Sequence, residues 1–114
     1  MLRGVLDLCV LALLERDAVY GYEVAQRLAE RGLEVAEGSV YPLLARLQRT
    51  ELVASQLRSG NGGPPRCYYL LTERGRAVLT EGRAVWGQTA AAVDGLLRVA
   101  GTGGRPASEL EEAR

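Results

Sequence analysis

Apolar residues recur at helical spacing in three segments of the first half of the chain. Residues 2–16 are apolar on nearly every side, so a helix here needs cover from several directions. Residues 22–31 and 37–50 each carry one apolar stripe at spacings of three and four. Gly32 follows the second segment as a candidate C-terminal cap. The inward positions predicted are Val24, Ala25 and Leu28, then Val40, Leu43, Leu44 and Leu47.

The pattern then changes to two short β-prone segments. Residues 53–58 and 66–71 are each bounded by turn-forming residues, and residues 59–65 between them read Ser-Gly-Asn-Gly-Gly-Pro-Pro. This arrangement predicts a β-hairpin with a long tip. Residues 17–21 are interpreted as a break between the first two helices.

A last helix is predicted from Thr72, a candidate N-cap, to about residue 99. Its apolar residues form one stripe with a period near 3.5, and a helix of about 26 residues extends roughly 39 Å. That length exceeds what a domain of this size covers, so the stripe is expected to pack against a second chain. The predicted organisation is a domain over 1–71, a dimerisation helix over 72–99 and a flexible tail over 100–114.

Three helices, a hairpin and a further helix predict a mainly α fold with a small β-hairpin, of the winged helix-turn-helix type. In such folds the third helix enters the DNA major groove and the hairpin is the wing. The chain has no net charge, but residues 38–70 carry four arginines against one glutamate, a net charge of +3. The remaining residues carry a net charge of −3, which balances this positive charge. A local positive face is typical of a DNA-binding protein, while an ordinary solvated surface is the alternative.

Composition excludes several kinds of chemistry. All 14 cationic residues are arginine and the chain has no histidine, so the usual neutral-pH general base is missing. With Cys9 and Cys67 as the only cysteines, a zinc site within one chain is not expected, and both thiols are interpreted as inert. The sequence therefore predicts no enzyme, no catalytic residue, no metal and no cofactor.

The apolar N-terminal segment does not predict a membrane protein. Residues 5–14 are interrupted by Asp7 and are too short to span a bilayer. No small-residue cleavage site follows them. A cytoplasmic protein without membrane contact is expected.

Four motifs in fixed order resemble the PadR-type transcriptional regulators. Residues 2–7 read Leu-Arg-Gly-Val-Leu-Asp and residues 20–24 read Tyr-Gly-Tyr-Glu-Val. Residues 37–44 read Glu-Gly-Ser-Val-Tyr-Pro-Leu-Leu, and residues 69–75 read Tyr-Leu-Leu-Thr-Glu-Arg-Gly. The resemblance implies a dimeric winged-helix regulator, usually a repressor that small molecules or stress signals release from DNA.

The chain departs from that family pattern at two positions. Ala36 stands where a capping serine is common, which costs on the order of 1 kcal/mol unless Ser39 caps the helix one turn later. Pro42 also favours a cap near Gly38 or Ser39, because proline is tolerated best at the start of a helix. Tyr20 replaces a common histidine.

The candidate DNA contacts lie on the third helix and the wing. Arg46 is expected either to read guanine or to bind phosphate, and Tyr41 to contact DNA or to pack in the core. Tyr22 is expected in the core rather than on DNA. The glycine-rich tip either contacts DNA or faces solvent. The predicted contact residues are Ser39, Tyr41, Pro42, Arg46, Arg49, Arg58, Asn61 and Arg66.

The first and last helices supply the predicted dimer interface: Leu6, Val10, Leu79, Trp86, Val93 and Leu97. In the multidrug-binding branch of the PadR-type regulators, a tryptophan at the position of Trp86 stacks on flat aromatic drugs between subunits. The resemblance thus implies an effector site of Trp86 with Asp7, Leu8 and Leu11. A packing role for Trp86 is the alternative.

These observations predict a dimeric DNA-binding transcriptional regulator, a repressor released by a small-molecule effector. Its expected partners are double-stranded DNA with an inverted-repeat operator, a second copy of the chain and a planar aromatic small molecule. The alternative is a winged-helix module for protein–protein contacts without sequence-specific DNA binding. A steep salt dependence of DNA binding separates the two.

Overall fold

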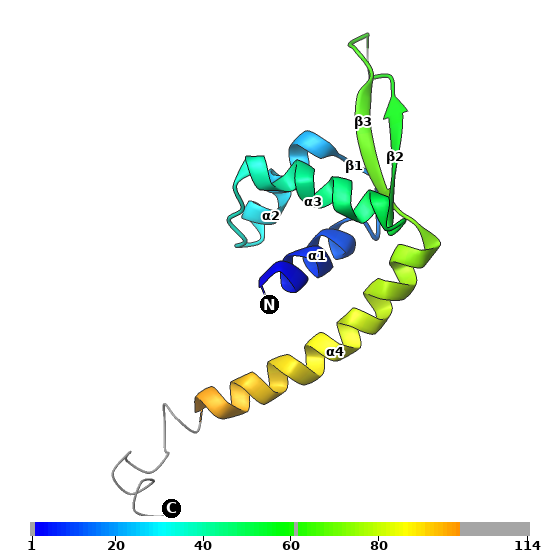
Figure 1. Ribbon diagram of the computed structural model, residues 1–114. Helices are drawn as coiled ribbons and strands as arrows, with labels where there is room; N and C mark the ends of the chain where they lie inside the picture. Colours follow the sequence, from blue (N-terminus) through cyan, green and yellow to red (C-terminus); the bar gives the residue numbers. More distant parts are fainter. Residues whose placement is uncertain (1, 61, 99–114) are drawn as a thin grey trace, which may run out of the picture. The chain divides into compact units, whose positions relative to one another are not determined.

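The computed structural model describes residues 2–60 and 62–98, and the predicted order of helices and hairpin is confirmed (Figure 1). Asn61 and the predicted tail over 100–114 lie outside these described residues. The elements are α1 (Leu2–Leu13), β1 (Val19–Tyr20), the 3₁₀ turn η1 (Gly21–Glu23), α2 (Val24–Glu30), α3 (Glu37–Arg49), β2 (Val53–Arg58), β3 (Arg66–Leu71) and α4 (Glu73–Arg98).

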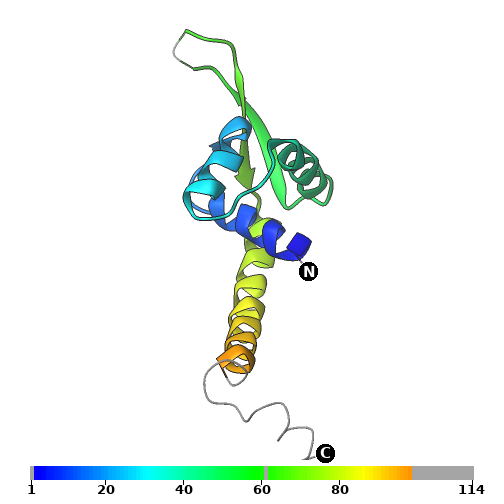
Figure 2. The same cartoon turned by 90° about the vertical axis from the view of Figure 1, so that its left-hand side faces the viewer.

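The chain forms two compact units, Met1–Gly82 and Arg83–Arg114. The first unit includes the start of α4, because Gly75 and Leu79 of that helix are buried. In this unit α1, α2 and α3 gather at the base of the β2–β3 hairpin (Figure 1, Figure 2).

One hydrophobic core holds the first unit together. Every inward position predicted for α2 and α3 is buried, which confirms the stripe of each helix. The core also takes in Val10, Leu11 and Leu14 from α1 and its C-terminal turn, Val19 from β1 and Leu79 from α4. Burial of such side chains contributes about 1.5–3 kcal/mol each.

The ends of the first two helices differ slightly from the prediction. The first helix ends at Leu13, three residues early, and a turn follows in which the Leu14 N–H donates to the Val10 carbonyl at 3.1 Å. The second begins at Val24, because the preceding residues form the 3₁₀ turn.

The predicted cap at Gly32 is confirmed. This glycine has φ 92°, and its N–H donates to the Ala29 carbonyl at 3.0 Å. The N–H of Leu33 donates to the Leu28 carbonyl at 2.9 Å. Together these two bonds form a Schellman motif, which satisfies carbonyls at the end of α2.

A three-stranded antiparallel sheet with the order β1-β3-β2 carries the hairpin. The hairpin register runs from Val53↔Leu71 to Arg58↔Arg66, and β1 adds Tyr20↔Tyr68 beside β3. The break predicted over 17–21 therefore contains a strand. Two residues are too few to show an alternating pattern, and their partner strand lies about fifty positions later in the sequence.

The end of α3 is tied directly to the start of α4. Glu51 adopts φ 63°, and the N–H of Leu52 donates to the Leu47 carbonyl at 2.9 Å. The Thr72 N–H then donates to the Leu52 carbonyl at 3.1 Å, and the Thr72 hydroxyl donates to the Glu51 carbonyl at 2.7 Å. Thr72 Oγ1 also accepts the Gly75 N–H at 2.9 Å, which confirms Thr72 as the N-cap of α4.

Beyond Gly82, α4 presents an apolar surface. Residues 83–98 are exposed except for Thr89 and Ala90, which are half-buried. The large apolar side chains exposed there are Val85, Trp86, Val93, Leu96 and Leu97. Within the described ranges, no helix combines the length and hydropathy needed to cross a membrane.

Candidate nucleic-acid interface

The outward face of α3 is built from small residues and one arginine. Gly38, Pro42, Ala45 and Arg49 follow each other at spacings of four, three and four, opposite the buried stripe, and all four are exposed. Small side chains allow a helix backbone to approach a partner closely. Arg49 adds a cation at the C-terminal end of this face.

The start of α3 differs from the prediction of a cap near Gly38 or Ser39. The helix begins at Glu37, with Ala36 as an N-cap that provides no side-chain hydrogen bond. Pro42 consequently lies in the second turn, where its missing N–H leaves the Gly38 carbonyl without an intrahelical donor. The Ser39 N–H donates to the Ala36 carbonyl at 2.9 Å, and the exposed residues Glu37 and Gly38 carry the other N–H groups of this turn, which suit a phosphate.

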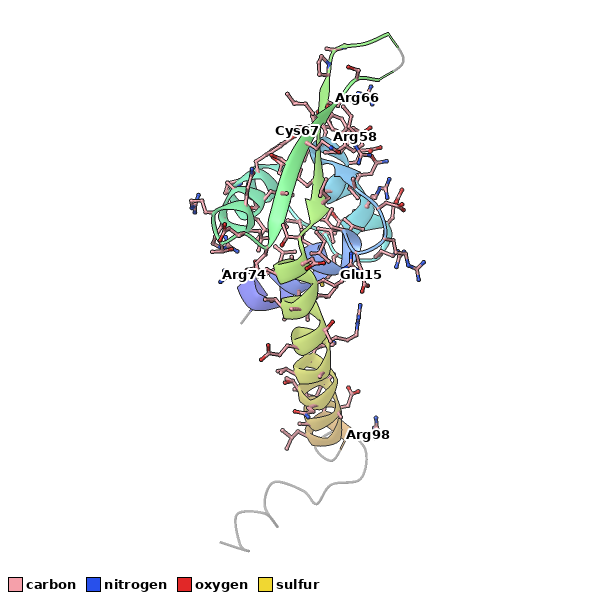
Figure 3. All side chains as sticks on the ribbon, turned by 90° about the vertical axis from the view of Figure 1, so that its right-hand side faces the viewer. Glu15, Arg58, Arg66, Cys67, Arg74 and Arg98 are labelled. Carbon is pink, nitrogen blue, oxygen red and sulfur yellow. The ribbon has the colours of Figure 1, made fainter. Side chains whose placement is uncertain are left out.

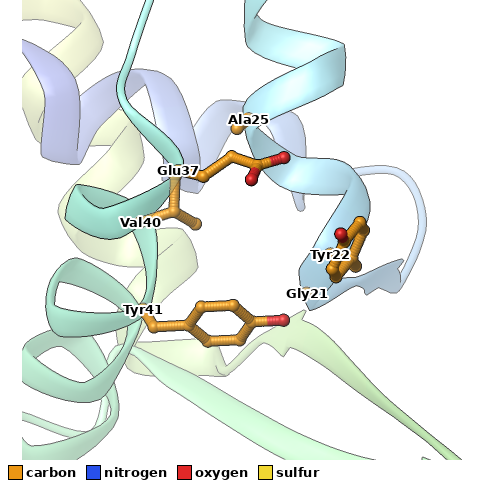
Figure 4. Close-up of a pocket in the computed structure, with 6 residues that line it drawn as sticks. All are labelled: Gly21, Tyr22, Ala25, Glu37, Val40 and Tyr41. Carbon is orange, nitrogen blue, oxygen red and sulfur yellow. The ribbon is translucent and has the colours of Figure 1, made fainter.

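A small hollow separates the start of α3 from the η1–α2 segment (Figure 4). Its volume is about 30 Å³, enough for about one water molecule. The ring of Tyr41 extends from α3 toward Gly21 and Tyr22 on the other side (Figure 4). A Cβ on Gly21 would lie 2.8 Å from Tyr69 Cε2 and 3.3 Å from Tyr41 Cε1, so the two rings require glycine there.

Both tyrosines at this hollow are exposed. Tyr22 is 63% exposed and its ring stacks on Tyr20 and not on the core, so its predicted core position is wrong. Tyr41 is 48% exposed, which removes the core alternative for this residue. Desolvation, reinforced by Tyr20 and Cys67 nearby, raises the pKa of Tyr41. A tyrosine hydroxyl is protonated at neutral pH even at its ordinary pKa, so Tyr41 can donate a hydrogen bond there.

The outer face of the sheet carries an array of arginine and tyrosine that the sequence did not reveal. The Arg58 guanidinium lies 5.2 Å from the Tyr68 ring centre, and that of Arg66 lies 5.1 Å from the Tyr20 ring centre. The rings of Tyr20 and Tyr68 are 5.9 Å apart, and Tyr22 stacks on Tyr20 at 6.1 Å. Figure 3 shows Arg58 and Arg66 close together on the hairpin. Cation–π contacts hold both wing arginines in place.

The two arginines of α3 have different surroundings. Arg49 is exposed, whereas Arg46 Nη2 donates to Asp7 Oδ1 of α1 at 2.5 Å. The side chains of Arg46 and Asp7 are 26% and 29% exposed. The predicted DNA contact Arg46 therefore has a carboxylate partner within the chain, whereas Arg58 and Arg66 contact tyrosine rings.

The predicted dimer and effector residues other than Asp7 divide into three groups by exposure. Val10, Leu11 and Leu79 are at most 2% exposed in the core of a single chain, so they offer no surface to a partner or effector. Leu6 and Leu8 are half-buried beside that core. Trp86, Val93 and Leu97 are 43–65% exposed.

The cysteines are half-buried and unpaired by disulfides. Burial raises the pKa of the Cys9 thiol. On β3, Cys67 hydrogen-bonds with Tyr69, and burial together with this bond raises the pKa of Tyr69 to about 12. Within the described ranges, no three residues of the types that hold metals come together.

A helical unit that exposes one face of its third helix beside an antiparallel hairpin defines a winged-helix DNA-binding protein. Residues 10–81 match the transcriptional regulator PadR-like family, and the chain belongs to that family. This confirms the resemblance in the sequence motifs. The chain is accordingly a DNA-binding transcriptional regulator and not an enzyme.

Solved structures and sequence relatives agree with this assignment. A PadR-like regulator from Bacillus cereus is 40% identical and superposes with a TM-score of 0.79, covering 86% of this chain and 96% of that one. One from Eggerthella lenta is 38% identical with a TM-score of 0.73, covering 84% and 85%. The transcriptional regulator Rv3488 of Mycobacterium tuberculosis is 40% identical over 65 residues, 57% of this chain and 60% of its own length.

Proposed function

We propose that this regulator is a dimeric repressor that reads an inverted-repeat operator with α3 and the wing. The observation that carries the proposal is the exposure of Arg49 on α3 and of Arg58 and Arg66 on the hairpin, the two elements that contact DNA in winged-helix proteins. None of the three forms a salt bridge within residues 2–60 and 62–98. Their charges are therefore available to DNA phosphates.

The proposed contacts combine positioning and readout. Arg58 and Arg66 bind phosphate or the minor groove, with their guanidinium groups held over tyrosine rings. Ser39, Tyr41, Pro42 and Arg49 approach the major groove. The predicted contact Asn61 remains a proposal without a described position. Two copies of α3 in a symmetric dimer require half-sites about one helical turn apart.

Salt-dependent DNA binding tests the proposal. A duplex selected by the wild-type protein from a random double-stranded library serves as operator probe, and affinity is measured over a range of salt concentrations. Arg49→Ala should weaken binding about tenfold and reduce the slope of log affinity against log salt by about 1.8, because a symmetric dimer loses two phosphate contacts. Arg76→Ala, a control at an exposed arginine of α4, should leave both unchanged.

The same experiment distinguishes the proposed function from the alternative, a module for protein–protein contacts. A wild-type protein that selects no sequence and shows no salt-dependent affinity is a protein-interaction module. Equal slopes for Arg49→Ala and wild type would remove Arg49 from the interface.

We further propose that planar aromatic molecules release the repressor by stacking on Trp86, which is 46% exposed on α4. Stacking adds about 0.5–1.5 kcal/mol per ring beyond the burial of area. Such ligands should quench Trp86 fluorescence and weaken operator binding, and Trp86→Ala should abolish the effect on operator binding while leaving the dimer intact. Quenching without a change in operator affinity would reduce Trp86 to a packing residue.

A further inference from the structure

We infer that Asp7 is a positioning residue for DNA binding, which sets the orientation of α3 by holding Arg46 against α1. The inference rests on the proposed function and assigns a role to two residues predicted for other tasks. Asp7 then binds no effector, and Arg46 reads no base.

The contact between these residues is short and sheltered. It joins positions 39 apart in the sequence, with 2.5 Å between Arg46 Nη2 and Asp7 Oδ1 and about a quarter of each side chain exposed. A second salt bridge, Arg74–Glu51, spans 3.8 Å between side chains that are 66% and 80% exposed. Water and salt screen the exposed pair, whereas the sheltered pair keeps more of its attraction.

Helix geometry explains why Arg46 differs from Arg49. The outward stripe of α3 passes through Pro42, Ala45 and Arg49. Arg46 follows Ala45 by one position and is therefore rotated about 100° around the axis, toward α1. For Arg46 to reach DNA, its hydrogen bond would have to break and the Asp7 carboxylate would lose its cation. The ion pair therefore favours a structural role for the positive charge of Arg46 over a contact with DNA.

The same turn of α1 also contacts α4. Leu8 lies against Gly82, where a Cβ would be 2.6 Å from Leu8 Cδ1. Within the Met1–Gly82 unit, neighbouring residues of α1 thus contact α3 on one side and α4 on the other. Removing the charge of Asp7 takes away a polar contact between α1 and α3, and with it the hydrogen bond that fixes the Arg46 side chain.

A double-mutant cycle on operator binding tests the inference with Asp7→Asn, Arg46→Gln and the double variant, using the library-selected duplex. Each single change should lower affinity about tenfold, and the double variant should bind no more weakly than either, since both remove one interaction. The salt slope of all three should equal that of the wild type, because no phosphate contact is lost. Arg46→Lys, which keeps the charge next to Asp7, should bind within about threefold of the wild type.

Other outcomes overturn the inference. If Asp7→Asn binds as well as or better than the wild type while Arg46→Gln has a reduced salt slope, Arg46 contacts DNA directly. Additive losses would mean that the two residues act separately. Thermal unfolding of each variant shows whether it still folds. If Arg46→Gln unfolds, the single variants Asp7→Asn and Arg46→Lys still test the inference. A wild type without salt-dependent binding would instead refute the proposed function itself, together with the role assigned to Asp7.

Discussion

At the scale of single residues, Gly75 is restricted by the backbone that faces it. A Cβ at this position would overlap the carbonyl oxygen of Leu52 and lie 2.7 Å from Leu71 Cδ1. The Leu52 carbonyl cannot move away, because it accepts the Thr72 N–H that aligns the start of α4. The glycine of the Leu-Thr-Glu-Arg-Gly motif therefore permits α4 to begin next to the end of α3.

Gly75→Ala should lower the free energy of unfolding by about 2 kcal/mol, since overpacking outweighs the gain of about 1 kcal/mol in helix propensity. The matched control is Gly87→Ala in the same helix, where a Cβ meets open space and should stabilise by about 0.5–1 kcal/mol. Denaturant unfolding of both variants measures the difference. Equal stabilisation by the two changes would contradict the close approach at Leu52.

At the scale of elements, β3 determines how the sheet responds to alkaline pH. Tyr69 lies on this central strand between Val19 of β1 and Ser55 of β2. Burial and the hydrogen bond with Cys67 raise the pKa of Tyr69 from 10 to about 12. Between these values the unfolded chain binds fewer protons than the folded chain, so the free energy of unfolding decreases as pH rises from about 10 to about 12.

Tyr69→Phe should remove this contribution and flatten the decrease of stability above about pH 10. Urea unfolding across that range measures it, and the absorbance of tyrosinate during titration of the folded protein should lose its latest step. An alkaline decrease identical to that of the wild type would show that other groups cause it.

The third helix shows how far an element can be predicted. Its buried stripe follows from the spacing of Val40, Leu43, Leu44 and Leu47, and all four are buried. The assignment of its arginines to DNA does not follow from spacing alone, because Arg46 stands on the border between the outward and inward faces. The carboxylate of Asp7, far away in the sequence, determines which way that side chain points.

At the scale of the whole molecule, the exposed apolar face of Arg83–Arg98 supports the proposed dimer. Val93→Glu should convert the dimer to a monomer in analytical ultracentrifugation, since a charge would be buried in an apolar seam. Gln88→Glu, an equal charge change off the stripe, should remain dimeric. Sedimentation of Val93→Glu as a dimer would place the interface elsewhere. Leu79→Glu is no test of this kind, because Leu79 belongs to the core of the single chain.

The sequence by itself determined the order of the helices and the hairpin, the buried faces of α2 and α3, and the family. These properties depend on local spacing, on turn-forming residues and on short motifs such as the one that ends at Gly75. Each of these signals lies in residues that are neighbours in the sequence. The cap at Thr72 and the turn at Gly32 were predictable for the same reason.

Only the tertiary structure decided the pairing of β1, the exposure of Tyr22 and the partner of Arg46. Each depends on contacts between residues far apart in the sequence, and no local pattern records which of several neighbours a side chain will meet. The sequence around a charged residue does not indicate whether that residue faces solvent, DNA or a carboxylate on another helix. Packing brings Asp7 within reach of Arg46 and leaves Arg49 free, because the two arginines occupy different sides of one helix.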